Sequence, residues 1–164
     1  MIVYGVLRDM LTRVGNIWDF HDEKRWIVIT TNIGWKKDGT NPMGAGIALS
    51  ASDKYPELPC WYGKRCKKYG ANTAVAIYKP GRLILFPTKP LNLSQPWMSW
   101  KSDADIDLIR RSTIQLAKLA EVINIGTKIG LPLVGCENGN LRAKQVLPIL
   151  RQYLDDRFVL FERD

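Results

Sequence analysis

Two glycine-containing segments have residue types and spacing that suit an anion. The first runs from Asn41 to Ala48 and reads N-P-M-G-A-G-I-A, and the second runs from Gly135 to Leu141 and reads G-C-E-N-G-N-L. Glycine removes the Cβ atom where backbone could close on a ligand. The amides of a glycine loop that opens a helix form an anion site, which the helix dipole strengthens. An ordinary tight turn explains either loop alone equally well. Together, at the carboxyl ends of neighbouring strands, they would border a cleft for a diphosphate.

The sequence offers few candidate residues for a metal site or for a Ser–His–Asp triad. His21 is the single histidine, and it lies in the charged segment H-D-E-K-R, which we expect to be a solvated turn. The cysteines Cys60, Cys66 and Cys136 are odd in number and have no C-x-x-C spacing, so reduced thiols are favoured over a disulfide framework. No usual zinc spacing joins them to His21. We therefore expect no metal site and no cofactor.

Composition points to one ordinary globular domain with an anionic partner. The 164 residues suit a single domain, 1–164, with a real core. The net charge of +8 favours an anionic partner, and nucleic acid is the leading candidate, although a merely soluble basic protein is the alternative. No apolar run approaches the roughly 18 residues of a membrane span. Arg8 and Asp9 interrupt the first apolar stretch, which argues against a secretory signal. We expect a cytoplasmic protein, with no membrane partner and monomer as the default state.

The glycine loops require strands before them and helices after them. Residues 26–31 form an apolar, β-branched run that is typical of a strand buried on both faces. Residues 128–134 form the strand-like run before the second loop. A helix is predicted over residues 46–54, with Ile47, Leu49 and Ala51 mostly inward.

Strands and helices alternate along the rest of the chain. A capping-box pattern at Ser102–Asp105 predicts the start of the clearest amphipathic helix. The helix at 58–69 carries a basic face, Lys64, Arg65, Lys67 and Lys68, which could meet either solvent or phosphates. This alternation predicts an α/β layered fold. The other expected elements are strands at 1–7, 11–14, 73–78, 82–86 and 158–161, the two at 73–86 forming a hairpin, and a helix at 142–154.

Four markers occur in an order that resembles a known family. Gly15-Asn16-Ile17 forms a turn, Asn32 ends the buried strand, residues 43–48 read M-G-A-G-I-A, and residues 131–141 read L-P-L-V-G-C-E-N-G-N-L. These markers resemble the macro domains, which bind ADP-ribose, and the resemblance covers nearly the whole chain. It implies a three-layer α/β/α macro domain with a mixed central β-sheet.

The resemblance also implies a binding site for ADP-ribose or for a macromolecule that carries it. Asn16 and Ile17 would lie near the adenine, Asn32 would contact the distal ribose, and the diphosphate would meet backbone amides of both loops. The implied ligand-binding residues are Asn16, Ile17, Asn32, Met43, Gly44, Ala45, Gly46, Ile47, Gly135, Cys136, Glu137, Asn138, Gly139, Asn140 and Leu141.

Phe86-Pro87-Thr88-Lys89 resembles the F-P-T-K element of the DarG-type branch, antitoxins that remove ADP-ribose from DNA bases. In that branch the lysine is catalytic, so the resemblance makes Lys89 the expected catalytic residue, with Asn32 orienting the ribose hydroxyls. A lysine could protonate the leaving base as an ammonium or attack ribose C1″ as a neutral amine. Without the resemblance, Lys89 reads as a surface lysine at a strand end and Asn32 as a loop-capping asparagine.

Two positions depart from the family pattern, and no tryptophan follows Leu141. Glu137 and Asn140 stand where glycines are expected. A carboxylate at Glu137 disfavours a neighbouring diphosphate unless it points away or takes up a proton, and it could instead serve as an acid or base. The related terminal ADP-ribose protein glycohydrolase pairs its lysine with an aspartate, but Gly139 occupies that position here. A mechanism that needs both residues is therefore not supported.

Three functions remain open at this stage. The first is hydrolysis of ADP-ribosylated DNA. The second is another macro-domain activity, such as an ADP-ribose-1″-phosphate phosphatase or a protein-directed ADP-ribosyl hydrolase. The third is a non-catalytic ADP-ribose-binding module. The loop between Asn32 and Met43, which contains Trp35, Lys36 and Lys37, could be a lid or a substrate contact.

Overall fold

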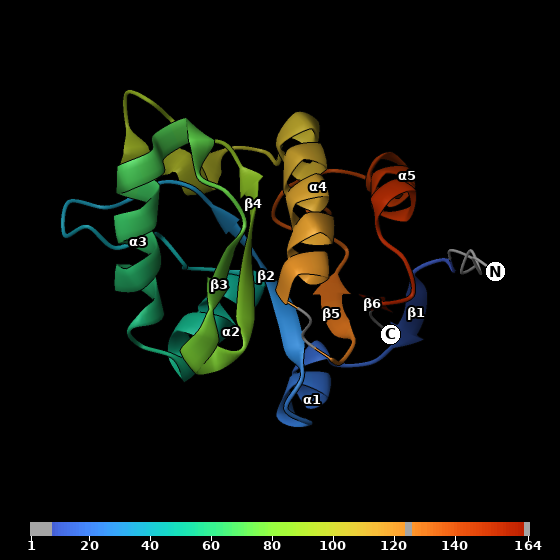
Figure 1. Cartoon of the computed structure of the whole chain (residues 1–164). Coiled ribbons are helices and arrows are strands. Elements are labelled where there is room, and N and C mark those ends of the chain that lie inside the picture. Colours follow the sequence, from blue (N-terminus) through green and yellow to red (C-terminus); the bar gives the residue numbers. More distant parts are fainter. Residues whose placement is uncertain (1–7, 124–125, 163–164) are drawn as a thin grey trace.

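The computed structural model describes residues 8–123 and 126–162, so the strand expected at residues 1–7 lies outside the described residues. The described chain alternates strands with helices (Figure 1). The elements are β1 (Leu11–Val14), α1 (Ile17–Asp22), β2 (Trp26–Asn32), α2 (Gly46–Lys54), α3 (Leu58–Tyr69), β3 (Ala76–Tyr78), β4 (Leu83–Lys89), α4 (Ile106–Ile123), β5 (Ile129–Pro132), α5 (Ala143–Tyr153) and β6 (Phe158–Glu162), with short 3-10 helices η1 (Gly70–Asn72), η2 (Lys79–Gly81) and η3 (Pro96–Lys101).

The strands form one six-stranded sheet in the order β1-β6-β5-β2-β4-β3. Neighbouring strands from β1 to β4 are parallel, and β3 is antiparallel to β4 through the expected hairpin. Parallel strands end at the same edge of a sheet, so the segments after β2, β4 and β5 leave from one edge.

Helices cover both faces of this sheet. Ile27 and Ile29 of β2 pack in one buried cluster with residues of α1, α2 and α3, while Val28 packs in a second cluster with residues of α4 and α5. This division follows from the strand period of two, which points successive side chains to opposite faces. Figure 1 shows α4 and α5 on the opposite side of the sheet from α2 and α3. The predicted three-layer α/β/α fold with a mixed sheet is confirmed.

Strand β4 is longer than expected, because it continues past Phe86 through Pro87 to Lys89. Proline cannot donate a ladder hydrogen bond and is tolerated where a strand has a free side. The β3 strand pairs with β4 only as far as Leu85, so β4 has such a free side beyond that residue. The whole P-T-K segment is therefore held in extended backbone.

The predicted start of α4 is wrong in detail. Its first residue is Ile106, and the Asp105 carboxylate accepts a 2.9 Å hydrogen bond from the Leu108 amide. Asp105 is thus the helix cap, because its oxygen satisfies an otherwise orphan amide of the first turn. Ser102 and Asp103 precede the helix, and the Asp103 carboxylate accepts a hydrogen bond from Asn140 instead.

Two local expectations are also wrong. His21 is buried at 3% exposure, and its Nε2 lies 2.6 Å from the Gly81 carbonyl oxygen. Burial lowers the pKa of His21, which favours the neutral ring. Leu49 is 41% exposed, whereas Ala51 is buried. Ile47 and Ala51 are four residues apart and share a helix face, but Leu49, two residues from each, lies on the far side.

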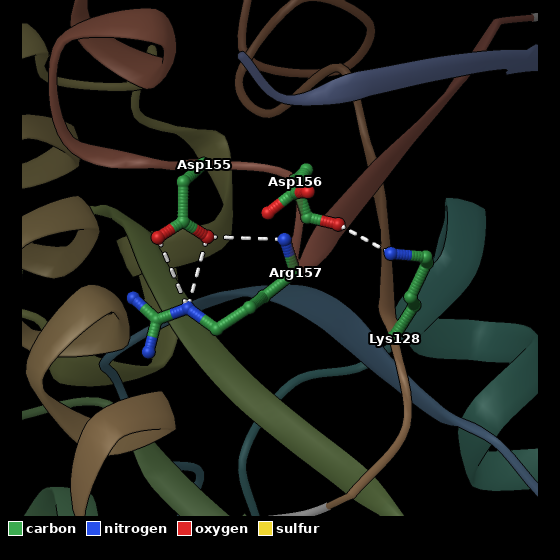
Figure 2. Close-up of polar contacts among 4 residues, drawn as sticks. All are labelled: Lys128, Asp155, Asp156 and Arg157. Atoms are coloured by element: carbon green, nitrogen blue, oxygen red, sulfur yellow. Dashed lines mark hydrogen bonds and ion pairs between the residues drawn. The ribbon is translucent and has the colours of Figure 1, made fainter. Parts of the chain in front are cut away.

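Polar contacts join the amino ends of β5 and β6, on the edge opposite the glycine loops (Figure 2). The Asp155 carboxylate accepts hydrogen bonds from Arg157 Nε at 2.9 and 3.1 Å, and Lys128 Nζ donates to the Asp156 carbonyl oxygen at 2.8 Å. Partial burial alone would raise the pKa of Asp155, but the hydrogen bonds and charge of Arg157 outweigh it and hold that pKa below its ordinary value.

None of the described helices is both long and apolar enough to span a membrane.

Candidate functional site

The carboxyl ends of β2 and β4 bring the two expected catalytic residues together. Asn32 is the Cα partner of Lys89, and a register shift lies between Thr31 and Asn32 in this pairing. Thr31 pairs with Pro87, so Thr88 is the extra residue of a bulge. Bulges re-aim side chains near the ends of strands. Lys89 therefore leaves the sheet beside Asn32.

Hydrogen bonds fix the backbone before Lys89. Ser112 Oγ, on α4, donates to the Pro87 carbonyl oxygen at 2.8 Å. The Thr88 hydroxyl donates to the Thr31 carbonyl oxygen at 3.2 Å, and the Thr88 carbonyl accepts from the Asp105 amide at 2.9 Å. The F-P-T-K element is thus tied to both β2 and α4, which limits the positions that Lys89 can reach.

The Lys89 ammonium contacts the 3-10 helix η3. Its Nζ donates to the Trp100 carbonyl oxygen at 2.7 Å. Partial burial lowers the pKa of Lys89, and the negative charge of Asp103 partly opposes that shift. A lowered pKa increases the fraction of neutral amine near neutral pH, which suits nucleophilic or proton-transfer chemistry.

Asn32 uses its side chain to shape the first glycine loop. Its Oδ1 accepts from the Gly34 amide and from Asn41 Nδ2, both at 3.0 Å, and its Nδ2 donates to the Pro42 carbonyl oxygen at 2.8 Å. Asn32 is buried at 6% exposure. These contacts match the loop-capping interpretation. A ribose contact through the second Nδ2 hydrogen stays a prediction.

The first glycine loop leads directly into α2. Met43 is buried in the core, Ile47 is half-buried against it, and the intervening Gly44, Ala45 and Gly46 are exposed. The helix cap, Ala45, offers no side-chain hydrogen bond to the first turn. The first amides of α2 therefore depend on other acceptors, as an anion-binding helix start requires.

The second glycine loop packs tightly against the segment before α4. The Ala104 amide donates to the Gly139 carbonyl oxygen at 2.9 Å, and the Leu141 amide donates to the Gly135 carbonyl oxygen at 3.0 Å. A Cβ on Gly139 would lie 2.5 Å from that Gly135 oxygen and 2.7 Å from Ala104 Cβ. Gly135 itself has φ +76°, in the left-handed region. Both glycines are therefore required by the loop's own geometry.

The two loops are neighbours in the folded chain. A Cβ on Gly46, which has φ +57°, would lie 3.1 Å from Asn138 Nδ2. A Cβ on Gly44 would meet nothing within 4 Å. The loops thus approach each other on one edge of the sheet, with open space beside Gly44.

The departures from the family pattern have structural explanations in part. Asn140 has φ +62° and so keeps the left-handed conformation, which asparagine tolerates better than most residues. Its Nδ2 donates to the Asp103 carboxylate at 2.7 Å. Glu137 is exposed, and its carbonyl oxygen accepts from the Asn140 amide at 3.2 Å. Cys136 is half-buried, and burial, followed by the charge of Glu137, raises its pKa, so it stays a thiol.

The predicted adenine-end residues lie at the start of α1. Asn16 caps this helix, because its Oδ1 accepts from the Trp18 amide at 2.9 Å. Ile17 is buried in the core cluster that also contains Phe20. Their contact with adenine stays a prediction.

Trp100 and Asp103 were not among the predicted site residues, although both act on Lys89. The Trp100 carbonyl holds Lys89, while the Asp103 charge acts on Lys89 and its carboxylate binds Asn140. A backbone carbonyl leaves no sequence signal. Asp103 did leave a sequence signal, since an aspartate just before a predicted helix is either a cap or a free carboxylate.

Comparisons with known proteins identify chains of similar sequence and fold. No family model matches the chain. The chain is 30% identical over 107 residues to a DNA ADP-ribosyl glycohydrolase of Mycobacterium tuberculosis. That match covers 60% of this chain but only 28% of the relative, so the chain corresponds to a minor part of that protein.

Solved structures extend the likeness across the fold. The macrodomain of Mycobacterium tuberculosis DarG has a TM-score of 0.66 and 25% identity, covering 85% of this chain and 90% of that one. Thermosipho africanus DarTG, in complex with ADP-ribose, has a TM-score of 0.70 and 18% identity, covering 96% of this chain and 43% of that one. The chain therefore has the macro-domain fold. Macrodomains of DarG are among the structures that it resembles.

Proposed function

We propose that this chain is an ADP-ribosyl hydrolase that removes ADP-ribose from a modified macromolecule, and that the macromolecule is ADP-ribosylated DNA. The observation that carries the proposal is Lys89. It ends β4 beside Asn32, its pKa is lowered by burial, and it lies on the edge of the sheet where both glycine loops emerge. The DNA ADP-ribosyl glycohydrolase relative and the net charge of +8 favour DNA as the substrate.

The glycine loops hold the ADP-ribose part of this substrate. Its diphosphate lies against the amides at the start of α2, beginning at Gly46, and against the loop around Asn138 and Gly139. The DarTG structure from Thermosipho africanus, which shares this fold, is a complex with ADP-ribose, which supports ADP-ribose as the ligand. The distal ribose then reaches Asn32 and Lys89.

The reaction breaks the C1″–N bond between ribose and base. The bonding electrons leave with the base nitrogen, which takes a proton, and water supplies the hydroxyl of the released ADP-ribose. As an ammonium, Lys89 would donate that proton. As a neutral amine, it would form a bond to C1″ and release ADP-ribose when water cleaves the adduct.

Turnover on three substrates tests the proposal. The substrates are an ADP-ribosylated oligonucleotide, an ADP-ribosylated peptide and ADP-ribose-1″-phosphate. We expect release from the oligonucleotide, and a loss of roughly a hundredfold to ten-thousandfold in kcat for Lys89→Ala, the range for a proton-transfer residue. ADP-ribose affinity should not change, because the loss lies in the transition state. Lys89→Arg should also fail, because guanidinium keeps its proton.

Lys79→Ala provides the matched control, because Lys79 is an exposed lysine at the opposite end of β4. It removes the same charge and should leave turnover unchanged. Sodium cyanoborohydride distinguishes the two roles of Lys89, since it would trap an imine adduct detectable by mass spectrometry. Near-normal turnover in Lys89→Ala would refute the lysine mechanism. Absence of turnover on every substrate, with ADP-ribose still bound, would identify a non-catalytic binding module.

A further inference from the structure

A hollow of about 240 Å³ lies on the surface beside η3. Two of its lining side chains are tryptophans and three are lysines, and none of the carboxylates in the described part of the chain lines it. The lining residues are Trp35, Lys36, Lys37, Lys67, Pro96 and Trp97. We call it the Trp–Lys hollow.

The Trp–Lys hollow adjoins the reactive end of the site without belonging to the glycine loops. Its Trp35 follows Asn32 by three residues. The loop after β2 packs directly on η3, because a Cβ on Gly34 would collide with the Pro96 carbonyl oxygen. The same 3-10 helix supplies the Trp100 carbonyl that holds Lys89 Nζ. A polymer that is joined to the distal ribose beside Lys89 would therefore have the hollow next to it.

The chemistry of the lining suits a base with its phosphates. Trp97 keeps 43% of its surface exposed, although a large aromatic side chain is normally covered. Lys36, Lys37 and Lys67 are exposed around it. The neighbouring Asp38 carboxylate accepts two hydrogen bonds from Thr40, at 2.7 and 3.0 Å, and does not line the hollow. Aromatic faces with flanking cations are the features that bind single-stranded nucleic acid.

Size sets the occupant. Sites for drug-sized ligands have volumes of roughly 300–1,000 Å³, so a hollow of about 240 Å³ suits one ring system better than a whole ADP-ribose. Trp35 is half-buried and packed against the core, which offers a rigid aromatic surface in the same hollow as the more exposed Trp97. A flat, unpaired base meets these conditions.

We propose that the Trp–Lys hollow binds an unpaired base next to the modified nucleotide, with Trp97 and Trp35 stacking on it and the three lysines on adjacent phosphates. This inference rests on the proposed function for the identity of the strand. It adds a subsite outside the ADP-ribose site, and it predicts that a paired duplex fits poorly because its bases are already stacked on one another.

Binding of unmodified DNA tests the subsite separately from turnover. The probe is a short fluorescein-labelled oligothymidine, measured by fluorescence anisotropy, with a duplex of the same length beside it. We expect Trp97→Ala to weaken single-strand binding about tenfold, the size of one lost base–aromatic stack. Trp97→Phe should restore much of the affinity. Affinity for free ADP-ribose, by calorimetry, and the melting temperature should not change in either variant.

Matched variants separate stacking from general charge. Lys67 and Lys64 are exposed lysines one turn apart on α3, and only Lys67 lines the hollow. Lys67→Ala should lower the salt dependence of single-strand binding by about 0.7 in the log–log slope, the value for one phosphate contact, and Lys64→Ala should lower it less. Tyr69→Ala, an exposed aromatic outside the hollow, should bind normally.

Three outcomes would overturn the inference. One is unchanged oligothymidine binding in Trp97→Ala. Another is that Trp97→Ala weakens binding to the single strand and to the duplex equally, which would indicate that the hollow attracts DNA by charge alone. The last is that Trp97→Ala loses binding to a labelled oligoglutamate peptide but keeps binding to DNA, which would assign the hollow to an acidic polypeptide. None of these measurements uses turnover. The proposal of a base-binding hollow can therefore be refuted while the hydrolase proposal stands, and the hydrolase proposal can be refuted while the hollow is still found to bind a base.

Discussion

The contrast between Gly139 and Gly44 gives the sharpest test of the site geometry. Both residues belong to the predicted ADP-ribose site, but their surroundings differ. A Cβ on Gly139 would lie 2.5 Å from the Gly135 carbonyl oxygen and 2.7 Å from Ala104 Cβ, whereas a Cβ on Gly44 would meet nothing within 4 Å. Gly139→Ala should therefore destabilise the fold, and Gly44→Ala should not.

The magnitude follows from what must move. The first obstacle at Gly139 is backbone, and the loop is also held by the hydrogen bond from the Ala104 amide to the Gly139 carbonyl, so neither side yields easily. Overpacking of this kind costs about 1–3 kcal/mol. In a chain of this size each kcal/mol corresponds to roughly 2–4 °C in Tm. We expect Gly139→Ala to lower Tm by about 2–12 °C, and Gly44→Ala to leave it near the wild-type value.

Calorimetry measures both stability and ligand binding on the same variants. Gly44→Ala should fold normally, while Gly44→Glu should fold normally and lose ADP-ribose affinity, since a carboxylate there would occupy the open space and repel the diphosphate. Equal Tm changes in Gly139→Ala and Gly44→Ala would refute the packing argument. Unchanged ADP-ribose affinity in Gly44→Glu would refute the placement of the ligand.

Two further predictions concern charged groups. Asp103→Asn removes the charge that raises the pKa of Lys89, so the pH midpoint of kcat that reports Lys89 should move to lower pH, and an unmoved midpoint would show that Lys89 does not limit turnover. Asp155→Asn removes the negative charge that Arg157 stabilises and one of the two oxygens that accept hydrogen bonds from Arg157, so it should cost about 0.5–1.5 kcal/mol at neutral pH. A carboxyl group whose pKa is depressed by folding stabilises the fold above its unfolded pKa of about 3.9, and this contribution is lost as the pH falls through the folded pKa. Thermal melts should therefore show that the stability difference between wild type and Asp155→Asn shrinks in acid. A stability difference that stays constant with pH would contradict this reasoning.

The sequence by itself determined the order and type of most elements. The apolar run at 26–31 became β2, and the helices expected at 46–54 and 58–69 have the boundaries Gly46–Lys54 and Leu58–Tyr69. These predictions succeeded because hydrophobic periodicity and turn residues act locally. The α/β layered class followed from the alternation of strands and helices, whereas the three-layer α/β/α arrangement was implied by the resemblance to macro domains. The Leu49 error came from treating alternate helix residues as one face.

The burial of His21 was decided by tertiary structure alone. Its neighbours in sequence are charged, but its ring nitrogen meets the Gly81 carbonyl, sixty residues away, inside the fold. A polar residue can be buried when a distant partner satisfies its hydrogen bond, and local sequence gives no sign of that partner.

The surroundings of Lys89 were also decided by tertiary structure. The sequence indicated the lysine through the F-P-T-K resemblance. Only the fold set it beside Asn32, under the Trp100 carbonyl and near the charge of Asp103. The physical reason is that desolvation and charge proximity depend on distances between segments far apart in sequence, and packing alone fixes those distances.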